Sequence, residues 1–428
     1  MAQALGPRAA GLGGLLPRGG GDRRDRWRRL WPRLTGRGPG RAVLPVSLPG
    51  TLPRRRIDHD RKNALRLTPQ LPRWSILAPL AACVLLGLSF TDIRSSLGLG
   101  WDAMLAAGLA AGILAAVFHA EVVAHKVGEP YGTLVLAIAV TAIEVALIVS
   151  LTMAAGGSAT GLARDTVFAA VMIILNGMVG LCLLAGAGRH REQSFGLHGV
   201  SAALATLAAI SVLTLVLPNY TTTTPGPTYS SSQLMFIAVV SLVLYGTFVL
   251  VQTVRHRDYF LPAVEAADED VHAAPPPTRM AVLSLLLLLV CLTTVVLLAK
   301  MLSPRLEAAV AALGAPKALV GIIIAGIVLL PESIAAYQAA RANRLQTSLN
   351  LALGSALASI GLTIPAVALV SLATGWTLSL GIDAKSTVLL LLSLTVAALS
   401  LGTGRTTVMQ GTVHLVIFAV YLFTAIVP

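Results

Sequence analysis

Charged residues and cysteines are both scarce in this sequence, and each scarcity removes a class of protein from consideration. Only 12% of the 428 residues are charged, against 55% that are hydrophobic, which argues against a chain that is surrounded by water on all sides. The three cysteines, Cys83, Cys182 and Cys291, stand singly in apolar runs without CxxC or metal-finger spacing. A disulfide framework and a thiol metal site are therefore unsupported, and we interpret the cysteines as packing residues.

The sequence also lacks the motifs of enzymes and channels that work within membranes. It has no HExxH, no GxSxG within an apolar run and no phosphate-binding glycine loop, which argues against an intramembrane enzyme. No repeated selectivity ring or gate is visible, which argues against a channel. We expect a protein without enzymatic activity and without a cofactor.

The formal net charge of +13 comes from one segment. Residues 1–74 contain 17 of the 32 Lys and Arg and only four acidic residues, whereas the rest of the chain is balanced. This tail is rich in Gly, Pro and Arg, so we predict that it is disordered; a transit peptide and a tail added by an upstream start codon are the alternatives. Its charge can contact anionic lipid and predicts no nucleic-acid partner.

Long apolar runs dominate the chain after Trp74. Each is about 20 residues long, the length of a helix that crosses a bilayer, so we predict an all-α polytopic membrane protein. The eleven expected spans are 75–91, 103–120, 132–154, 166–187, 197–217, 234–254, 281–301, 318–340, 347–373, 386–402 and 409–427. With the tail inside, the loops place nine Lys and Arg inside and six outside, in agreement with the positive-inside rule. We expect an integral protein of the bacterial inner membrane with a cytoplasmic N-terminus.

One loop, residues 255–280, is polar, acidic and proline-rich, and is the natural linker between two halves. Residues 75–102 then form an extra first helix with its loop, and residues 103–254 and 281–428 form two sets of five helices. An odd number of spans makes the second half enter the membrane from the opposite side. This is the inverted-repeat arrangement of many secondary transporters.

Two glutamates, Glu144 and Glu332, are the only acidic residues deep inside apolar runs. A carboxylate at that depth is costly unless it is paired, neutralised or wetted, and no basic residue lies deep in any span to pair with it. Each glutamate lies in the second helix of its half, so we expect both near the midplane. Pro331 cannot donate an N–H to the carbonyl of Ile327, which predicts irregular backbone beside Glu332. The sequence thus predicts one site built twice.

Polar residues in neighbouring spans extend this candidate site for cations and protons. Besides the two glutamates, the candidates are Thr141, Asn176, Ser355 and Ser359. Each hydroxyl has a simpler interpretation, as a group that bonds its own helix or fills a close helix contact. Carboxylates, hydroxyls and free carbonyls are hard oxygen ligands that suit Ca²⁺ or Na⁺, and the two glutamates are the predicted metal ligands.

A second group of residues is a candidate for proton relay or cation access. It consists of His414 in the last span and of His119, Glu121, His125 and Glu129 at the inner mouth. For His414 the alternative is a local hydrogen bond. For the others it is solvated loop charge.

Two nearby carboxylates in a medium of low dielectric repel each other unless protons or a cation lie between them. Protons and cation therefore compete for one site, which produces antiport if only the loaded or protonated forms change sides. Ca²⁺/H⁺ exchange is the leading hypothesis. Na⁺(K⁺)/H⁺ exchange at the same site is the alternative, and a membrane scaffold would leave the two acids unexplained.

Two long motifs resemble a known family. GEPYGTLVLAIAVTAIEVALIVSL (Gly128–Leu151) and PESIAAYQAARANRLQTSLNLALGSALASIGLTIP (Pro331–Pro365) resemble the two α-repeats of ChaA-type calcium/proton antiporters, in the cation/Ca²⁺ exchanger superfamily. The last span, Val408–Phe423, is similar to that family's final helix. The resemblance covers residues 75–428.

The resemblance implies an eleven-span exchanger that expels Ca²⁺, and in some members Na⁺ or K⁺, in exchange for H⁺. It implies that Glu144 and Glu332 are the ion-binding acids. Eukaryotic relatives carry Gly-Asn shortly before each acid, whereas this chain has Val140-Thr141 and Leu330-Pro331 in those places. The site of this chain therefore has fewer amide oxygens than theirs.

Overall fold

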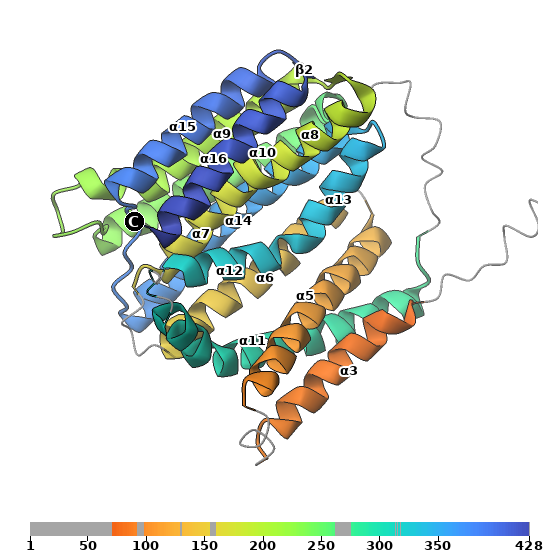
Figure 1. The fold of residues 1–428 in the computed structure, drawn as a ribbon, viewed down its shortest axis with the longest axis vertical. Helices are drawn as coiled ribbons and strands as arrows, with labels where there is room; N and C mark the ends of the chain where they lie inside the picture. The colour runs from red at the N-terminus through yellow and green to blue at the C-terminus, as the bar shows by residue number, and fades with distance from the viewer. Residues whose placement is uncertain are drawn as a thin grey trace, which may run out of the picture. The chain divides into compact units, whose positions relative to one another are not determined.

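The structure, a computed structural model, is built almost entirely of helices (Figure 1). It describes residues 71–91, 98–128, 131–154, 160–261, 275–312, 314, 316 and 318–427. Residues 1–70 of the predicted tail, the middle of the predicted linker and Glu129 therefore lie outside the described residues. The helices are α3 (Arg73–Leu88), α5 (Leu99–Val127), α6 (Tyr131–Ala154), α7 (Leu162–Met172), α8 (Val179–His190), α9 (Leu197–Ser211), α10 (Ser231–Leu250), α11 (Thr278–Ala312), α12 (Ala318–Val328), α13 (Leu330–Arg341), α14 (Leu345–Thr374), α15 (Ala384–Leu401) and α16 (Val408–Ile426). Apolar runs become helices in a bilayer because a helix satisfies its own backbone hydrogen bonds.

Short irregular segments connect or extend these helices. The π-helical segments are η1 (Ile173–Met178), which joins α7 to α8, η2 (Val212–Val216) and η4 (Val251–Arg255); the 3₁₀ segments are η3 (Leu217–Tyr220) and η5 (Arg257–Tyr259). Two short strands, β1 (Gln193–Ser194) and β2 (Arg405–Thr406), pair antiparallel.

The prediction of an all-α polytopic membrane protein is confirmed, but the number of spans differs from eleven. In the described part of the chain nine helices are long and apolar enough to cross a membrane, and α12 with α13 make a tenth span that is bent by 55°. The expected first span corresponds to α3, which has only 16 residues. Its rise of about 24 Å is shorter than the hydrocarbon core.

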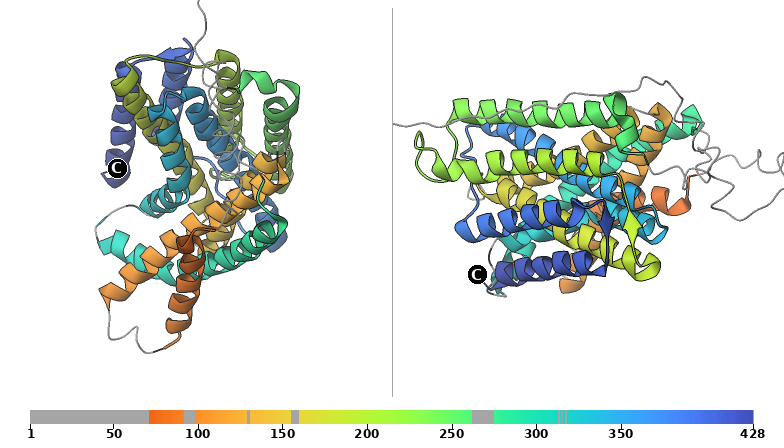
Figure 2. Two further views of the ribbon diagram at one scale, coloured as in Figure 1. Left: turned by 90° about the vertical axis from the view of Figure 1, so that its right-hand side faces the viewer. Right: turned by 90° about the horizontal axis from the view of Figure 1, so that it is seen from above.

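The helices form two sets with separate hydrophobic cores. The smaller core joins α3, α5 and α11, and the larger core joins α7 to α10 with α13 to α16. Figure 1 shows α6 and α12 between the two sets, and each gives one face to each core, as Ile324 and Ala325 of α12 do. Figure 2 (left) shows α5 and α11 inclined to the helices of the larger set.

Polar contacts tie the smaller set together. His119 of α5, which is fully buried, lies 2.9 Å from the carbonyl oxygen of Ser75 on α3 through its Nε2 atom. Asp102 of α5 forms an ion pair with Arg305 of α11. These two contacts, near opposite ends of α5, link it to α3 and to α11.

The contacts between helices of the two predicted halves come in pairs. For each contact there is a second one in which the corresponding helices of the two halves have changed places. α6 packs against α14, and α12 and α13 pack against α7 and α8; α10 packs against α14, and α16 packs against α8. The backbone pairings follow the same rule. β1, after α8, pairs with β2, before α16, and Thr228, before α10, pairs with Ser379, after α14. These paired contacts are those expected of two halves related by a two-fold axis, and the division into halves at 103–254 and 281–428 stays a prediction.

The helices α10 and α16, which correspond in this exchange, begin in the same way. Ser230 with Gln233, and Thr407 with Gln410, form capping boxes at their N-termini. A capping box satisfies backbone N–H groups that the first turn of a helix leaves free.

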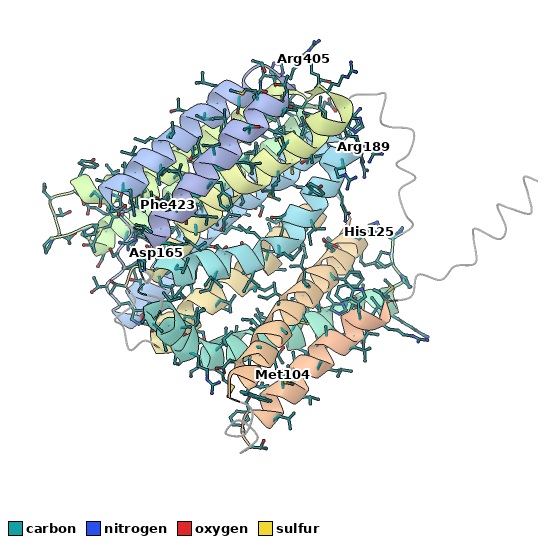
Figure 3. All side chains as sticks on the ribbon, in the orientation of Figure 1. Met104, His125, Asp165, Arg189, Arg405 and Phe423 are labelled. Atoms are coloured by element: carbon teal, nitrogen blue, oxygen red, sulfur yellow. The ribbon has the colours of Figure 1, made fainter. Side chains whose placement is uncertain are left out.

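The bundle has two ends that differ in charge. Figure 3 shows Asp165 and Phe423 at one end, the Asp165 end, and Arg189 and Arg405 at the other, the Arg189 end. The ends of α8 and α13, with Arg189 and Arg341, carry arginine in their last turns. Basic residues favour the cytoplasmic side, so the predicted orientation places the Arg189 end inside.

Close packing of α16 on α8 depends on a glycine. A Cβ atom on Gly411 would lie 2.6 Å from the backbone nitrogen of Leu184, which cannot move aside as a side chain can. We expect Gly411→Ala to destabilise the protein by about 1–3 kcal/mol through overpacking. Gly246→Ala is the control, because nothing lies within 4 Å of that Cβ position. Fluorescence-detected gel filtration after heating measures both; equal melting temperatures would contradict the packing argument.

Candidate functional site

The two predicted glutamates line one cavity. It has a volume of about 420 Å³, and its walls come from α6, α10, α12, α13 and α14, with Ala170 of α7 and Phe260 beyond η5. Of the six predicted binding residues, five line it: Thr141, Glu144, Glu332, Ser355 and Ser359. We call it the main cavity.

Glu144 is held by hydroxyl groups of a neighbouring helix. Ser359 donates to Glu144 Oε1 at 2.8 Å or to Oε2 at 2.9 Å, and Thr363 donates to Oε2 at 3.0 Å. The carboxylate is 4% exposed. Ser359 and Thr363 are one turn apart on α14 and face the middle of α6. These bonds hold the carboxylate in place and leave hydroxyl lone pairs free for a cation.

Glu332 lies where its helix is broken. α12 ends at Val328 and α13 begins at Leu330, with Pro331 and Glu332 in its first turn. The 55° bend agrees with the prediction from Pro331, which has no N–H for the preceding turn. Glu332 thus lies at the N-terminal, positive end of a half-helix, and its buried Oε2 atom has no hydrogen-bond partner among the described residues.

Among the described residues around the main cavity, no basic side chain balances the charge of the two acids. None of the described residues that line the cavity is Lys, Arg or His. Among the described residues, no group of three His, Cys, Asp or Glu side chains could hold a resident metal ion. Two carboxylates with nearby hydroxyls, in a cavity that is otherwise mostly apolar, can instead bind a cation that enters and leaves.

Asn176 and His414 are not brought to the main cavity. Asn176 lies in the π-helical segment η1. Its side-chain nitrogen donates to Ser393 Oγ on α15 at 2.8 Å. His414 is fully buried, and its Nε2 atom lies 2.8 Å from Ser400 Oγ. The local hydrogen bond that was the alternative for His414 is therefore present.

The residues predicted at the inner mouth do not form one solvated loop. His119, Glu121 and His125 all lie within α5, which extends to Val127, seven residues beyond the expected span. Glu121 and His125 are exposed, whereas His119 is fully buried against α3. The interpretation of His119 as solvated charge was wrong, because the helix continues and turns this side chain to Ser75.

Thr363, which binds Glu144, was missed in the sequence. The signal was present: Ser355, Ser359 and Thr363 follow one another at intervals of four residues and so form one stripe on α14. Only the first two were singled out. Tyr245 and Gln252 of α10 and η4 also line the cavity, but nothing in an apolar helix indicates which face meets α14.

Comparison with known proteins agrees with this architecture. The family described as sodium/calcium exchanger protein matches residues 97–254 and 283–427, which together make up well over half of the chain. The chain belongs to the sodium/calcium exchanger family. This exchanger is a membrane transporter and not an enzyme, and the resemblance to the cation/Ca²⁺ exchanger superfamily is confirmed.

Two relatives align with the exchanger over most of their own length. It is 49% identical to y4hA of Sinorhizobium fredii, an ionic transporter by name, over 359 residues, which cover 84% of this chain and 97% of that protein. It is 34% identical to the sodium-potassium/proton antiporter ChaA of Escherichia coli over 352 residues, which cover 82% of this chain and 95% of that protein.

Solved structures share the fold of the exchanger. Native YfkE matches with a TM-score of 0.63 at 16% identity, over 82% of this chain and 99% of that one. The H⁺/Ca²⁺ exchanger CAX matches with a TM-score of 0.58 at 16% identity, over 82% of this chain and 88% of that one. At such identity the likeness concerns the fold.

Proposed function

We propose that this protein exchanges Ca²⁺ for H⁺ across the membrane by alternating access, with both ions competing for Glu144 and Glu332. The observation that carries the proposal is that both acids line one cavity whose described lining has no basic residue. Two carboxylates are balanced by one divalent cation or by two protons. Occupancy by one ion therefore disfavours the other.

The two hydrophobic cores support alternating access. The α3, α5 and α11 set packs within itself, and α6 and α12 lie between it and the larger set. Packed groups of helices move more easily as units than by internal deformation, because close-packed cores are stiff. Movement of one set along the other would open the main cavity to one side and close it to the other.

Na⁺/H⁺ or K⁺/H⁺ exchange at the same acids is the second candidate. It is favoured by the 34% identity to a protein named sodium-potassium/proton antiporter. The amides also favour it: Asn176 does not line the cavity, and Asn350 is engaged by Gln346 and by the carbonyl of Phe260. Ca²⁺ prefers six to eight oxygen ligands, so a site with few amide oxygens suits a less demanding ion.

Everted membrane vesicles that hold an acidic interior test the proposal and separate the candidates. We expect addition of Ca²⁺ to release protons from vesicles that contain the protein, as measured with a fluorescent pH-gradient dye, and not from vesicles without it. Release by Na⁺ or K⁺ but not by Ca²⁺ would make the second candidate correct. No release by any of the three cations would remove proton-coupled exchange.

A further inference from the structure

A second polar cavity lies at the Asp165 end of the bundle. Its volume is about 220 Å³, and it is lined by the N-terminal turns of α7, α12 and α15 and by the C-terminal part of α16. Four charged side chains line it: Arg164, Asp165, Asp383 and Lys385. We call it the Asp165 cavity. Figure 3 shows Asp165 and Phe423 of this region far from Arg189.

The Asp165 cavity corresponds in part to the main cavity when the halves are exchanged. The lining of the main cavity includes α6, α10 and α14, with Leu136, Val249 and Leu351. The packing pairs described above match α6 with α12, α10 with α16, and α14 with α7. Those three counterparts, α12, α16 and α7, line the Asp165 cavity. In a transporter built from inverted repeats, exchange of the repeats converts the access route of one side into that of the other.

Two helices, α7 and α12, contribute to the lining of both cavities. On α12, Ile322 lines the Asp165 cavity and Ala325 lines the main cavity; three residues of helix rise span about 4.5 Å. On α7, Phe168 lines the Asp165 cavity and Ala170 lines the main cavity. Both cavities therefore reach α7 and α12, at positions two or three residues apart along each helix.

An aromatic pair joins α7 to α16 at the Asp165 cavity. Phe168 of α7 and Tyr421 of α16 meet edge to face, with ring centroids 5.6 Å apart and an angle of 87° between the rings. Both line the Asp165 cavity, and they are only 6% and 4% exposed. A close pair of aromatic rings is bulky and mostly apolar, so it disfavours the passage of a hydrated cation.

Polar bonds fasten the outer rim of the Asp165 cavity. Arg164 donates to Asp165 Oδ1 at 2.7 Å, to the carbonyl of Gly381 at 3.2 Å and to Ser379 Oγ at 3.4 Å. Lys385 donates to the carbonyl of Thr424 at 2.7 Å. These bonds tie α7 to the loop before α15, and α15 to α16.

We propose that the Asp165 cavity is the access route for the transported cation from the side opposite the Arg189 end, closed in this conformation by the Phe168–Tyr421 pair. The proposal rests on the proposed cation exchange. It adds the location of the second route and its barrier. Arg164 is a positioning residue that stabilises the closed form by holding α7 to the α15 loop.

Labelling of a single cysteine tests the route without requiring transport. In a background with Cys83, Cys182 and Cys291 replaced by serine, Ala325→Cys reports access to the main cavity. A membrane-impermeant cationic methanethiosulfonate is applied only from the Asp165 side. A closed protein populates its open form at roughly 0.1–10%, so Phe168→Ala with Tyr421→Ala should raise the labelling rate at least about tenfold.

Two controls accompany this test. Phe423→Ala removes a 64% exposed aromatic side chain of the same helix and should leave the rate unchanged. Ala384→Cys is exposed at the same end outside the cavity lining and should react equally in every variant. If the double variant fails to fold, Arg164→Gln with a cysteine at Ile322 gives the second measurement, and faster labelling is again expected.

The proposal is overturned if Ala325→Cys reacts from the Asp165 side no faster without the two rings, or if Phe423→Ala has the same effect as their removal. Unchanged labelling of Ile322→Cys in the Arg164→Gln background overturns it as well. These outcomes are independent of the vesicle assay. If the labelling is as expected but no cation releases protons from the vesicles, the proposed access route is supported and the proposed exchange is wrong.

Discussion

Glu144→Gln and Glu332→Gln are each expected to abolish cation-driven proton release, reducing its initial rate by roughly 100-fold or more, which corresponds to about 2.7 kcal/mol. Glutamine has nearly the same shape as glutamate, but it can neither release a proton nor supply negative charge to a cation. At position 144 it can still accept hydrogen bonds from Ser359 and Thr363. The fold should therefore survive while the exchange fails.

The vesicle assay measures this effect, and gel filtration of the purified variants measures folding. Glu192→Gln is the matched control: this glutamate lies in the loop between α8 and β1, where its side chain is 50% exposed and contacts Arg405, outside the cavity lining. It should retain the wild-type rate. Full activity of either cavity variant would show that the corresponding acid does not carry the transported ions.

Loss of the hydroxyl groups that hold Glu144 is expected to weaken cation binding, which is the second large effect. Removing both with Ser359→Ala and Thr363→Ala leaves a buried carboxylate without its three close contacts. A hydrogen bond to a charged group is worth about 1.5–3 kcal/mol. Because both carboxylates remain for the cation, we expect the double variant to lose about as much binding energy as one such bond supplies, so the half-saturating cation concentration should rise by roughly tenfold to a hundredfold. The maximal rate should change less, because both carboxylates remain.

Ser355→Ala is the control for this experiment. Ser355 lies on the same stripe of α14 and lines the cavity, but it forms no hydrogen bond with Glu144 among the described residues. Initial rates over a range of cation concentrations separate affinity from turnover. Equal half-saturating concentrations for the double variant and Ser355→Ala would contradict a role of these bonds in cation binding, and Ser359→Thr should restore part of the affinity.

Much of the fold was predictable because it follows from local patterns. The length of the apolar runs predicted where the helices lie, and Pro331 predicted the break between α12 and α13. Span counting was less successful at the ends: α3 is shorter than the bilayer, and α5 continues past His119 into what had been taken as a loop. Helix ends in a chain this apolar have few polar residues to indicate them.

Predictions for single side chains agreed with the structure where they did not depend on which helix lies beside the residue, and they were less successful where they did. Glu144 and Glu332 were found because a carboxylate in an apolar run is costly wherever its helix packs. Asn176 was proposed for the site because a buried amide needs a partner, and His414 was proposed as a proton relay; each has a local partner, Ser393 and Ser400. Their burial was foreseeable, whereas their partners were not.

By itself the sequence determined that this is a membrane protein of many helices, with one acid in the second helix of each predicted half and a proline beside one of them. The tertiary structure decided that Ser359 and Thr363 meet Glu144, that both acids share a cavity, and that a second cavity lies at the Asp165 end. The reason is that a sequence sets the spacing of residues along a helix face. In a helix that is apolar all round, it does not set which neighbour that face contacts.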